Sequence, residues 1–495
     1  IERGDYKENP GFDAVIGNPP HGAKYDKLEK DYYNEKYTHI NDSVSLFFDS
    51  SYEIVAISGK IGLLFPKGVL LSNPYKPLRM TLFSSQELSE CLDFGRYFHD
   101  TELEFAGLLL EKGKKHKYLF LSVCTPTEYN SIQWDYEDIL PIRRFICGVH
   151  RSDVKVLKSI SKYKTKERIT GYRGLPKRYI SSEGKSCISH ENIYHYLIEE
   201  PTQYIDTSSI SKGVLMRQSK KRIIARRRMR RSTIPYPHSI VDATIENGSV
   251  LTFETVENIS HTNLELKLEY IVSILNSKLI EWYINRAIYL FPKTTTDFDD
   301  EYLQDIPIPS ISFITPKEER KKLVANLKQK YQNEDFNKTL KIVEMCFPKD
   351  KKGNFITDKE KSDVVHDFLA FLAEQMIEMN KEKNAEIKGF LKWLEIEVGA
   401  KIDDMRNKTV IKKYYNRDFE TLIGILKKNK SKLQIDPSRR NFQEKVRAEF
   451  ESSVLKLKPI IARIEKTDWL IDQVVYKLYG LTDEEIKIVE RSVKN

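Results

Sequence analysis

The chain has 495 residues, a length that suggests about three domains. Its 81 Lys and Arg exceed its 72 Asp and Glu, and the formal net charge of +9 is a mild bias toward polyanions. No apolar run approaches about 18 residues, which excludes a membrane-spanning helix, and no signal peptide is visible. The five cysteines are scattered, with neither a CxxC pair nor a His at metal-ligand spacing. We therefore expect free thiols in a reducing cytoplasm and no metal site.

The first predicted strand leads into an unusual turn. Residues 12–16 form a short apolar run with β-branched members, which predicts a buried strand. Pro19 and Pro20 then fix two φ angles and remove two backbone donors, so the carbonyls around them are expected to be free for a ligand. Asn18 adds a side-chain amide with an acceptor and donors, and His21 adds a flat ring. Ligands of open α/β sheets bind at the carboxyl edge of the strands, where such a turn can hold a planar group bearing an NH2.

The segment FDAVIGNPP, followed by GAK, resembles motif IV of amino-methyltransferases, (D/N/S)PP(Y/F/W), in its adenine-N6 form. The resemblance implies a catalytic turn of Asn18, Pro19, Pro20 and His21. The Asn18 side chain and the Pro19 carbonyl would accept hydrogen bonds from the target amine and orient it toward the methyl group of S-adenosylmethionine. His21 stands where the family has an aromatic residue that stacks on the flipped base, whose extrusion costs roughly a few kcal/mol. An NPP turn also occurs in enzymes that methylate glutamine side chains, and an ordinary strand-ending turn is the remaining alternative.

Predicted strands and helices alternate up to about residue 129. A charged stretch, residues 24–37, is expected to be a loop or short helix, and Asn41 with Asp42 can cap a helix that continues to Ile57. The segments GKIGLLFPKGVLLS and FAGLLLEKG resemble later strands of the same catalytic domain. We therefore expect residues 1–140 to form the C-terminal part of a class I methyltransferase, with a Rossmann-like α/β sheet.

The same resemblance implies that most of the cofactor site lies upstream of this sequence. Members of this class hold S-adenosylmethionine with a glycine-rich turn after their first strand and an acidic residue after the second. Only eleven residues precede Phe12, and the downstream glycines are isolated. We therefore expect a fragment, inactive alone, in which only Asn18 adjoins the cofactor and the main cofactor site lies upstream. No PD…(D/E)xK nuclease pattern is convincing, so Mg is expected only if a nuclease domain lies upstream.

Residues 141–312 differ in composition, and their turn clusters and short β-like runs predict a mixed α+β domain. The most basic part, residues 217–231 (RQSKKRIIARRRMRR), is here called the basic segment. It has nine Lys and Arg, and no acidic residue within it can neutralise them. Such a segment can place arginines on the phosphates or guanine edges of double-stranded DNA, or it can be an ordinary solvated face. The predicted DNA contacts are Arg217, Lys220, Lys221, Arg222, Arg226, Arg227, Arg228, Arg230 and Arg231.

Residues 266–285 carry apolar side chains at helical spacing and predict one core-facing helix. With YLQDIPIP at 302–309 they resemble the end of the TaqI-like specificity domain, where an LLNSKL helix precedes a YL-x-x-(I/L)P(I/V)P exit. This second match lies far from the NPP turn and in the expected order. It implies that residues 141–312 are a target recognition domain.

Residues 313–495 are predicted to be a helical C-terminal domain. Thr315 opens a capping box with Pro at the first helical position, and residues 363–384 have helical periodicity. Residues 467–490 predict two helices separated at Gly480, with Thr482 beginning the second. Their phrase D-x-x-VY-x-LYGLT-x-EEI resembles the C-terminal signature of type IIG restriction–modification methyltransferases.

Three functions fit these patterns. The first is an S-adenosylmethionine-dependent adenine-N6 DNA methyltransferase of a restriction–modification system. The second is a catalytically silent DNA-specificity module, which the imidazole of His21 favours. The third, methylation of RNA or of a protein glutamine, keeps the NPP turn but does not explain the long recognition region.

Overall fold

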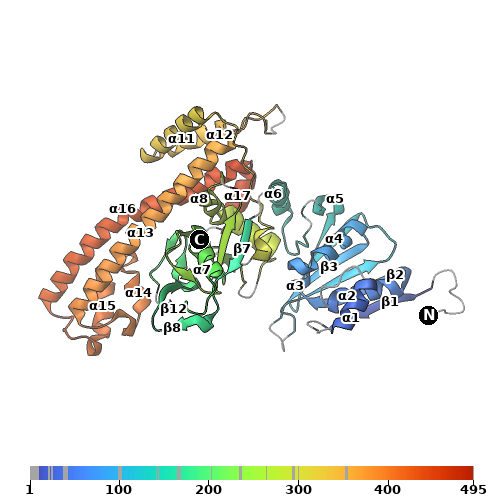
Figure 1. Ribbon diagram of the computed structural model, residues 1–495, viewed down its shortest axis with the longest axis horizontal. Coiled ribbons are helices and arrows are strands. Elements are labelled where there is room, and N and C mark those ends of the chain that lie inside the picture. Colours follow the sequence, from blue (N-terminus) through green and yellow to red (C-terminus); the bar gives the residue numbers. More distant parts are fainter. Residues whose placement is uncertain are drawn as a thin grey trace.

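The computed structural model (Figure 1) describes residues 10–20, 23, 26–36, 43–98, 103–140, 142, 144–163, 169–201, 203–233, 237–263, 265–292, 296–298, 300–351 and 355–493. A sheet region lies at one end in blue, a β-rich region follows in green and yellow, and long helices extend away in orange and red. The fold is thus a mixed sheet plus a helical part. No helix in these ranges is long and apolar enough to cross a membrane.

The N-terminal sheet has the strand order β1-β2-β4-β3-β5-β6. Two neighbouring pairs, β1 with β2 and β3 with β5, are parallel, and the other pairs are antiparallel. The strands are β1 (Phe12–Gly17), β2 (Val55–Pro66), β3 (Leu88–Gly95), β4 (Phe105–Glu111), β5 (Tyr118–Thr125) and β6 (Glu128–Asp135). The helices are α1 (Lys27–Lys36), α2 (Ser43–Ile54), α3 (Gly68–Leu71), α4 (Lys76–Ser85), α5 (Tyr136–Ile139) and α6 (Arg151–Ser161), with the turn η1 (Asn73–Tyr75). Among the described strands, β1 is therefore an edge. None of its residues is buried, so the prediction of a buried strand over residues 12–16 is wrong: the strand forms, but as an edge it has a described sheet neighbour on one side only.

The predicted helix to Ile57 ends three residues early. Helix α2 stops at Ile54, and β2 begins at Val55, which pairs with Phe12 of β1. Gly59 lies within β2, and a Cβ there would come within 2.8 Å of the Phe12 carbonyl oxygen. Pairing with β1 thus outweighs the local helical pattern. The predicted caps Asn41 and Asp42 lie outside the described residues.

The middle region contains two four-stranded sheets, ordered β16-β13-β18-β7 and β17-β9-β12-β8, and the strand pairs β10-β11 and β14-β15. Its strands are β7 (Ile169–Arg173), β8 (Ile180–Ser181), β9 (Lys185–Ile188), β10 (Ile193–Tyr194), β11 (Leu197–Ile198), β12 (Gln203–Ile205), β13 (Arg222–Arg226), β14 (Arg230–Ser232), β15 (His238–Ile240), β16 (Ala243–Glu246), β17 (Leu251–Thr252) and β18 (Val256–His261). Its helical segments are η2 (Lys177–Tyr179), η3 (His190–Asn192), α7 (Lys212–Gln218), α8 (Leu268–Leu275), α9 (Lys278–Tyr283), the π-helical turn η4 (Ile284–Ile288) and α10 (Asp300–Leu303).

The single helix predicted over residues 266–285 is broken between α8 and α9. Asn276 leaves the helix so that its side-chain amide pairs with Ala243, accepting from the backbone N at 3.0 Å and donating to the carbonyl at 2.9 Å. Ser277 then caps α9 by accepting from the backbone N of Ile280 at 3.4 Å. Asn285 repeats the amide pairing on Ser239, with both bonds at 2.8 Å. Two asparagines thus hold helices against strand backbone.

The C-terminal helices are α11 (Lys317–Gln332), α12 (Phe336–Met345), α13 (Ser362–Val398), α14 (Lys408–Lys412), α15 (Phe419–Lys428), α16 (Arg440–Leu478) and α17 (Asp483–Val493), with the short turns η5 (Ile402–Asp404), η6 (Tyr414–Asn416) and η7 (Lys430–Lys432). Helices α13 and α16 pack along each other. One buried apolar cluster runs from Val44 to Val489, and a second, separate cluster lies between Phe390 and Leu457.

Two predicted caps have different outcomes. Thr315 does not cap α11, because its hydroxyl and backbone N donate to Asp363 of α13, at 2.6 and 3.0 Å. The other cap is confirmed. The backbone N of Thr482 donates to the Glu485 carboxylate at 2.8 Å, and the backbone N of Glu485 donates to the Thr482 hydroxyl at 3.3 Å. Gly480, at φ +69°, separates α16 from α17 as predicted.

Candidate active site and nucleic-acid interface

The NPP turn lies at the carboxyl end of β1, where Gly17 pairs with Leu63 of the parallel strand β2. Asn18 and Pro20 are exposed, and Pro19 is buried. Ile16, just before the turn, is 87% exposed, so apolar surface adjoins the amide of Asn18. His21 lies outside the described residues.

One carbonyl of the turn is already occupied. The hydroxyl of Ser43, the buried first residue of α2, donates a hydrogen bond to the Pro20 carbonyl. The expectation that all carbonyls of the turn are free for a ligand is therefore wrong for Pro20. Within the described part of the chain, no hydrogen bond engages the Asn18 side chain or the Pro19 carbonyl. The turn is thus fixed at its second proline, whereas these two acceptors have no partner among the described residues.

The N-terminal sheet is joined to the middle region through buried charges. Lys67, directly after β2, contacts Asp93 at 2.7 Å and Glu104 at 3.0 Å, and donates to the Leu290 carbonyl at 2.9 Å. Burial acts to lower the pKa of Lys67, but the two carboxylates raise it overall. The ammonium therefore stays charged. No sequence pattern predicted this contact, because its acidic partners lie far from Lys67 along the chain.

The basic segment does not form one exposed face. Its nine cations divide into four that are exposed and five that are buried or half-buried. The exposed cations are Arg217, Lys220, Lys221 and Arg228. The others are Arg222, Arg226, Arg227, Arg230 and Arg231.

Arg222 is a core residue rather than a DNA contact. Its side chain is 1% exposed and contacts Glu246 at 2.5 Å. It also donates to the Asn258 side chain at 2.8 Å and to backbone carbonyls, including that of Val250 at 3.1 Å. Because the guanidinium is enclosed and its charge is matched, it cannot reach a phosphate. The prediction that Arg222 contacts DNA is therefore wrong.

Acidic residues from distant segments neutralise other parts of the basic segment. Arg230 donates two hydrogen bonds to the fully buried Asp242, one of them at 2.7 Å. Arg227 lies 3.4 Å from Asp297. Lys221 lies 2.5 Å from Glu269, but half of its side chain stays exposed. The absence of acidic residues within the segment is thus compensated across the fold.

The remaining cations of the segment make other contacts. Arg231 donates to the Pro292 carbonyl at 3.0 Å. Arg226 donates to the Arg228 carbonyl at 3.1 Å, and burial lowers its pKa. The side chain of Arg228 is 67% exposed and lies 3.9 Å from Asp297. Arg228, Lys220, Lys221 and Arg217 are thus the cations best placed to meet an external anion.

A cavity of about 470 Å³ adjoins Arg217. The Arg217 guanidinium lies 3.6 Å from the centre of the Tyr172 ring, a cation–π contact. Tyr172 and Tyr179 line the cavity together with Val214. The sequence offered only a turn cluster at 171–174, so the aromatic partner of Arg217 was missed. No spacing rule links residues this far apart.

Three segments of the chain match known protein families. Residues 2–98 match the family model of the Eco57I restriction-modification methylase, and residues 185–308 match the TaqI-like C-terminal specificity domain. Residues 362–475 match a domain of unknown function. The type II methyltransferase M.VspI of Vibrio sp. (strain 343) is 28% identical over 109 residues, which are 22% of this chain and 26% of that protein.

Two solved restriction–modification enzymes are similar at lower identity. The type IIL enzyme MmeI, solved with DNA, gives a TM-score of 0.41 at 9% identity, covering 72% of this chain and 53% of that one. The type IIG endonuclease BpuSI gives 0.28 at 12% identity, with the same coverage. The chain thus spans about half of these enzymes and about a quarter of M.VspI. The predicted resemblance to a restriction–modification methyltransferase with a TaqI-like specificity domain is confirmed by the matched family segments.

Proposed function

From the premise that this chain carries a restriction–modification methylase region followed by a TaqI-like specificity region, we propose that it serves methylation of adenine N6 in double-stranded DNA. The observation that carries the proposal is the NPP turn at the carboxyl end of β1. There Asn18 is exposed, and Ser43 engages Pro20 rather than Pro19. The side-chain oxygen of Asn18 and the Pro19 carbonyl are two acceptors for one amino group.

The chemistry follows from those acceptors. An exocyclic amine conjugated to a purine ring is a poor nucleophile, because its lone pair is delocalised into the ring. Two acceptors that take both N–H bonds favour the tetrahedral nitrogen whose lone pair can attack a methyl group. S-adenosylmethionine would supply that methyl group. The sequence has no glycine-rich turn of the kind that holds this cofactor, so only Asn18 is assigned near it.

Recognition of the duplex is assigned to the middle region. The match over residues 185–308 supports this role, and so do the exposed cations Arg217, Lys220, Lys221 and Arg228. Base flipping would bring the target to the turn, with His21 as the stacking ring. We divide the chain into a catalytic part (1–140), a target recognition domain (141–312) and a helical domain (313–495), and place it in the cytoplasm, in keeping with its free thiols.

The proposal is tested by Asn18→Ala in the full-length protein that carries this chain. Methyl incorporation into duplex DNA should fall at least about 100-fold, the usual scale for a lost positioned hydrogen-bonding group. Duplex affinity should stay unchanged, because the recognition contacts lie in another region. The matched control is Asn130→Ala, on the exposed strand β6 at the other edge of the sheet, which should keep full activity. Wild-type turnover by Asn18→Ala would place the chemistry elsewhere.

A second function, a silent DNA-specificity module, is favoured by the imidazole at position 21. Its signature would be a wild-type protein that binds duplex DNA but incorporates no methyl group, together with a His21→Tyr variant that does. Incorporation into RNA or into a protein glutamine, with duplex DNA inert, would support the third function instead.

A further inference from the structure

The segment between α13 and α16, residues 399–439, is here called the hairpin tip. It contains α14, α15 and three short turns, and it has its own apolar core. That core includes Ile411, Tyr414, Leu422 and Leu426, packed against Phe390 and Phe450 of the two long helices. The tip is therefore a packed unit with a defined backbone.

Positive charge is concentrated in the hairpin tip. It has eleven Lys and Arg against five Asp and Glu, a net charge of +6 within a chain of net charge +9. Helix α13 has four basic and eight acidic residues, and α16 has eight basic and six acidic residues. A solvated face usually mixes both signs, as α16 does. The tip departs from that pattern.

Every cation of the tip is exposed, namely Lys401, Arg406, Lys408, Lys412, Lys413, Arg417, Lys427, Lys428, Lys430, Lys432 and Arg439. Acidic partners are found for four of them: Lys401 with Glu395, Lys408 and Lys412 with the shared Asp403, and Lys430 with Asp436. Within the described ranges, no carboxylate lies within 4 Å of the other seven. Exposed ion pairs are weak and screened by salt, so the tip presents a largely unneutralised positive field.

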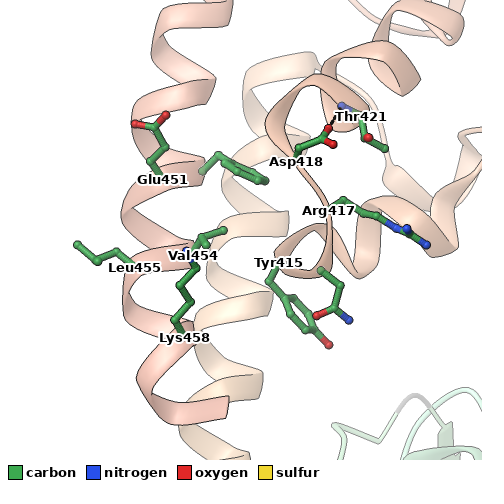
Figure 2. A pocket seen from close by; sticks show the side chains of 10 residues that line it. Tyr415, Arg417, Asp418, Thr421, Glu451, Val454, Leu455 and Lys458 are labelled. Carbon is green, nitrogen blue, oxygen red and sulfur yellow. Dashed lines mark hydrogen bonds between the residues drawn. The ribbon is translucent and has the colours of Figure 1, made fainter. Parts of the chain in front are cut away.

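A shallow groove of about 690 Å³ opens on this surface, between α16 and the segment that leads into α15 (Figure 2). Tyr415, Arg417 and Lys458 line it, an arrangement of cations and an aromatic ring. Asp418 also lines it, but its carboxylate caps α15 by accepting from the backbone N of Thr421 at 2.6 Å. A second acid, Glu451, also lines the groove and lies 3.6 Å from Arg447. In the described part of the chain, Arg417 has no carboxylate within 4 Å.

The long helices fix the tip relative to the specificity region. Lys278 contacts Asp472 of α16 at 2.8 Å, and His195 contacts Asp468 at 2.9 Å. Lys388 of α13 lies 3.5 Å from Glu200. In Figure 1 the tip lies at the end of the molecule away from the N-terminal sheet, with the specificity region between them. A duplex held by the specificity region can therefore reach the tip by extending to one side.

We propose that the hairpin tip is a second DNA-binding surface, which contacts the sugar–phosphate backbone outside the sequence held by the specificity region. This inference rests on the proposed function for its choice of polyanion. It assigns a role to the matched domain of unknown function: the two long helices act as a spacer that carries a cationic surface to flanking DNA. Backbone contacts of this kind add affinity without sequence preference.

The test replaces four unpaired cations of the tip in the full-length protein, Lys413→Gln, Arg417→Gln, Lys427→Gln and Lys428→Gln. The matched control neutralises four exposed lysines of α11 and α12, Lys317, Lys321, Lys322 and Lys341, all to Gln. The DNA affinity of both variants is measured on a duplex of about 15 base pairs and on a second duplex that is longer by about 25 base pairs, or roughly 85 Å. Circular dichroism checks that both variants fold.

The tip variant should bind the longer duplex at least about 10-fold more weakly, with a slope of log K against log salt shallower by about 2 to 4. On the short duplex its affinity should change less than about 3-fold, and the control variant should match wild type on both. The proposal is overturned if the tip variant binds each duplex as tightly as the wild-type protein does. It is also overturned by an equal loss in the control, which would show a general charge effect, or by a selective loss on RNA of the same length.

Methylation of the short duplex separates this inference from the proposed function. The tip variant should keep wild-type turnover there, whereas Asn18→Ala should not. If the tip effect appears on the long duplex while no variant methylates DNA, the catalytic proposal fails and the binding surface stands. If Asn18 is required but the tip variant is unaffected on the long duplex, the reverse holds.

Discussion

The basic segment and the hairpin tip are both cationic parts of the chain, and they differ in how much of their charge is exposed. The segment has nine cations within residues 217–231, of which only four are exposed. The tip has eleven cations scattered over residues 399–439, and all eleven are exposed. The density of charge along a sequence therefore does not measure the charge that a partner meets.

The difference comes from secondary structure. The segment supplies β13, a central strand in the order β16-β13-β18-β7, whose residues are covered by neighbours. In this sheet Arg222 is paired directly opposite Glu246 of β16, which a cross-strand ion pair requires. The tip is made of short helices around a small core, and helices direct their charged faces outward. The same residue types are thus structural in one region and available in the other.

The largest effect is expected at Arg222, the buried cation of the basic segment. Replacing Arg222 with Met leaves the buried carboxylate of Glu246 without its partner, and removing one member of a buried pair costs about 3–5 kcal/mol. Chemical denaturation should show this loss. The control Lys220→Met, two residues earlier and exposed, should stay within about 0.5 kcal/mol of wild type. If both variants are equally stable, Arg222 is not structural and its removal from the set of DNA contacts is wrong.

A smaller effect is expected at Lys278, which holds the long helix α16. Burial raises the pKa of Asp472 to about 6, although Lys278 opposes this shift. Lys278→Met should cost about 1–3 kcal/mol at pH 8, where the buried carboxylate loses its donor. Unfolding curves measured against pH should show the difference shrinking below pH 6 and vanishing near pH 4, because a protonated Asp472 needs no cation.

The sign follows from the raised pKa of Asp472. Its value in the folded protein lies above the ordinary 3.8, so the folded state binds this proton more tightly than the unfolded state does. The contribution of Asp472 to stability is therefore present at low pH and is lost as pH rises through about 6. Asp468, His195 and Tyr476 face the same cluster. The control Asp472→Asn should flatten the dependence, and an unchanged pH profile in that variant would assign it to another group.

The smallest effect concerns the exposed half of the basic segment. Arg217, Lys220, Lys221 and Arg228 changed together to Gln should leave stability within about 1 kcal/mol of wild type, because these side chains are exposed. DNA affinity should fall about 3- to 10-fold, with the salt slope lowered by about 0.9 for each phosphate that is no longer neutralised. Filter binding on both duplex lengths should show the same weakening, unlike the length-dependent effect expected of the tip. If binding weakens only on the longer duplex, the basic segment contacts flanking DNA, which is the role proposed for the tip.

Local patterns predicted some elements well. The apolar run before Asn18 is β1, and the segments GKIGLLFPKGVLLS and FAGLLLEKG contribute β2 and β4 of the same sheet. The stop at Gly480 and the cap at Thr482 also follow from short-range rules. Each of these depends on residues close together in sequence, which is why they could be predicted.

The misses have a common cause, which is a partner far away in the chain. Asn276 breaks a periodic helix because Ala243 takes its amide, and Thr315 abandons its cap for Asp363. Arg222 is buried because Glu246 lies across the strand. The position of the NPP turn could be predicted, but its second proline is held by Ser43 through a bond that no motif shows. The catalytic roles of Asn18, Pro19, Pro20 and His21 stay predictions.

The two asparagine amides that bind Ala243 and Ser239 have a consequence for sequence change. Each amide reads one peptide N–H and one peptide carbonyl, as a neighbouring strand does, and neither touches a side chain of its partner in doing so. The bonds use only backbone atoms at 239 and 243, and proline alone would remove the N–H. Both positions are fully buried, so they admit only small side chains. The hydrogen bonds themselves do not depend on the side chains of the strand residues that they hold. Exposed side chains elsewhere in the middle region can therefore change while this anchorage to the helices stays the same.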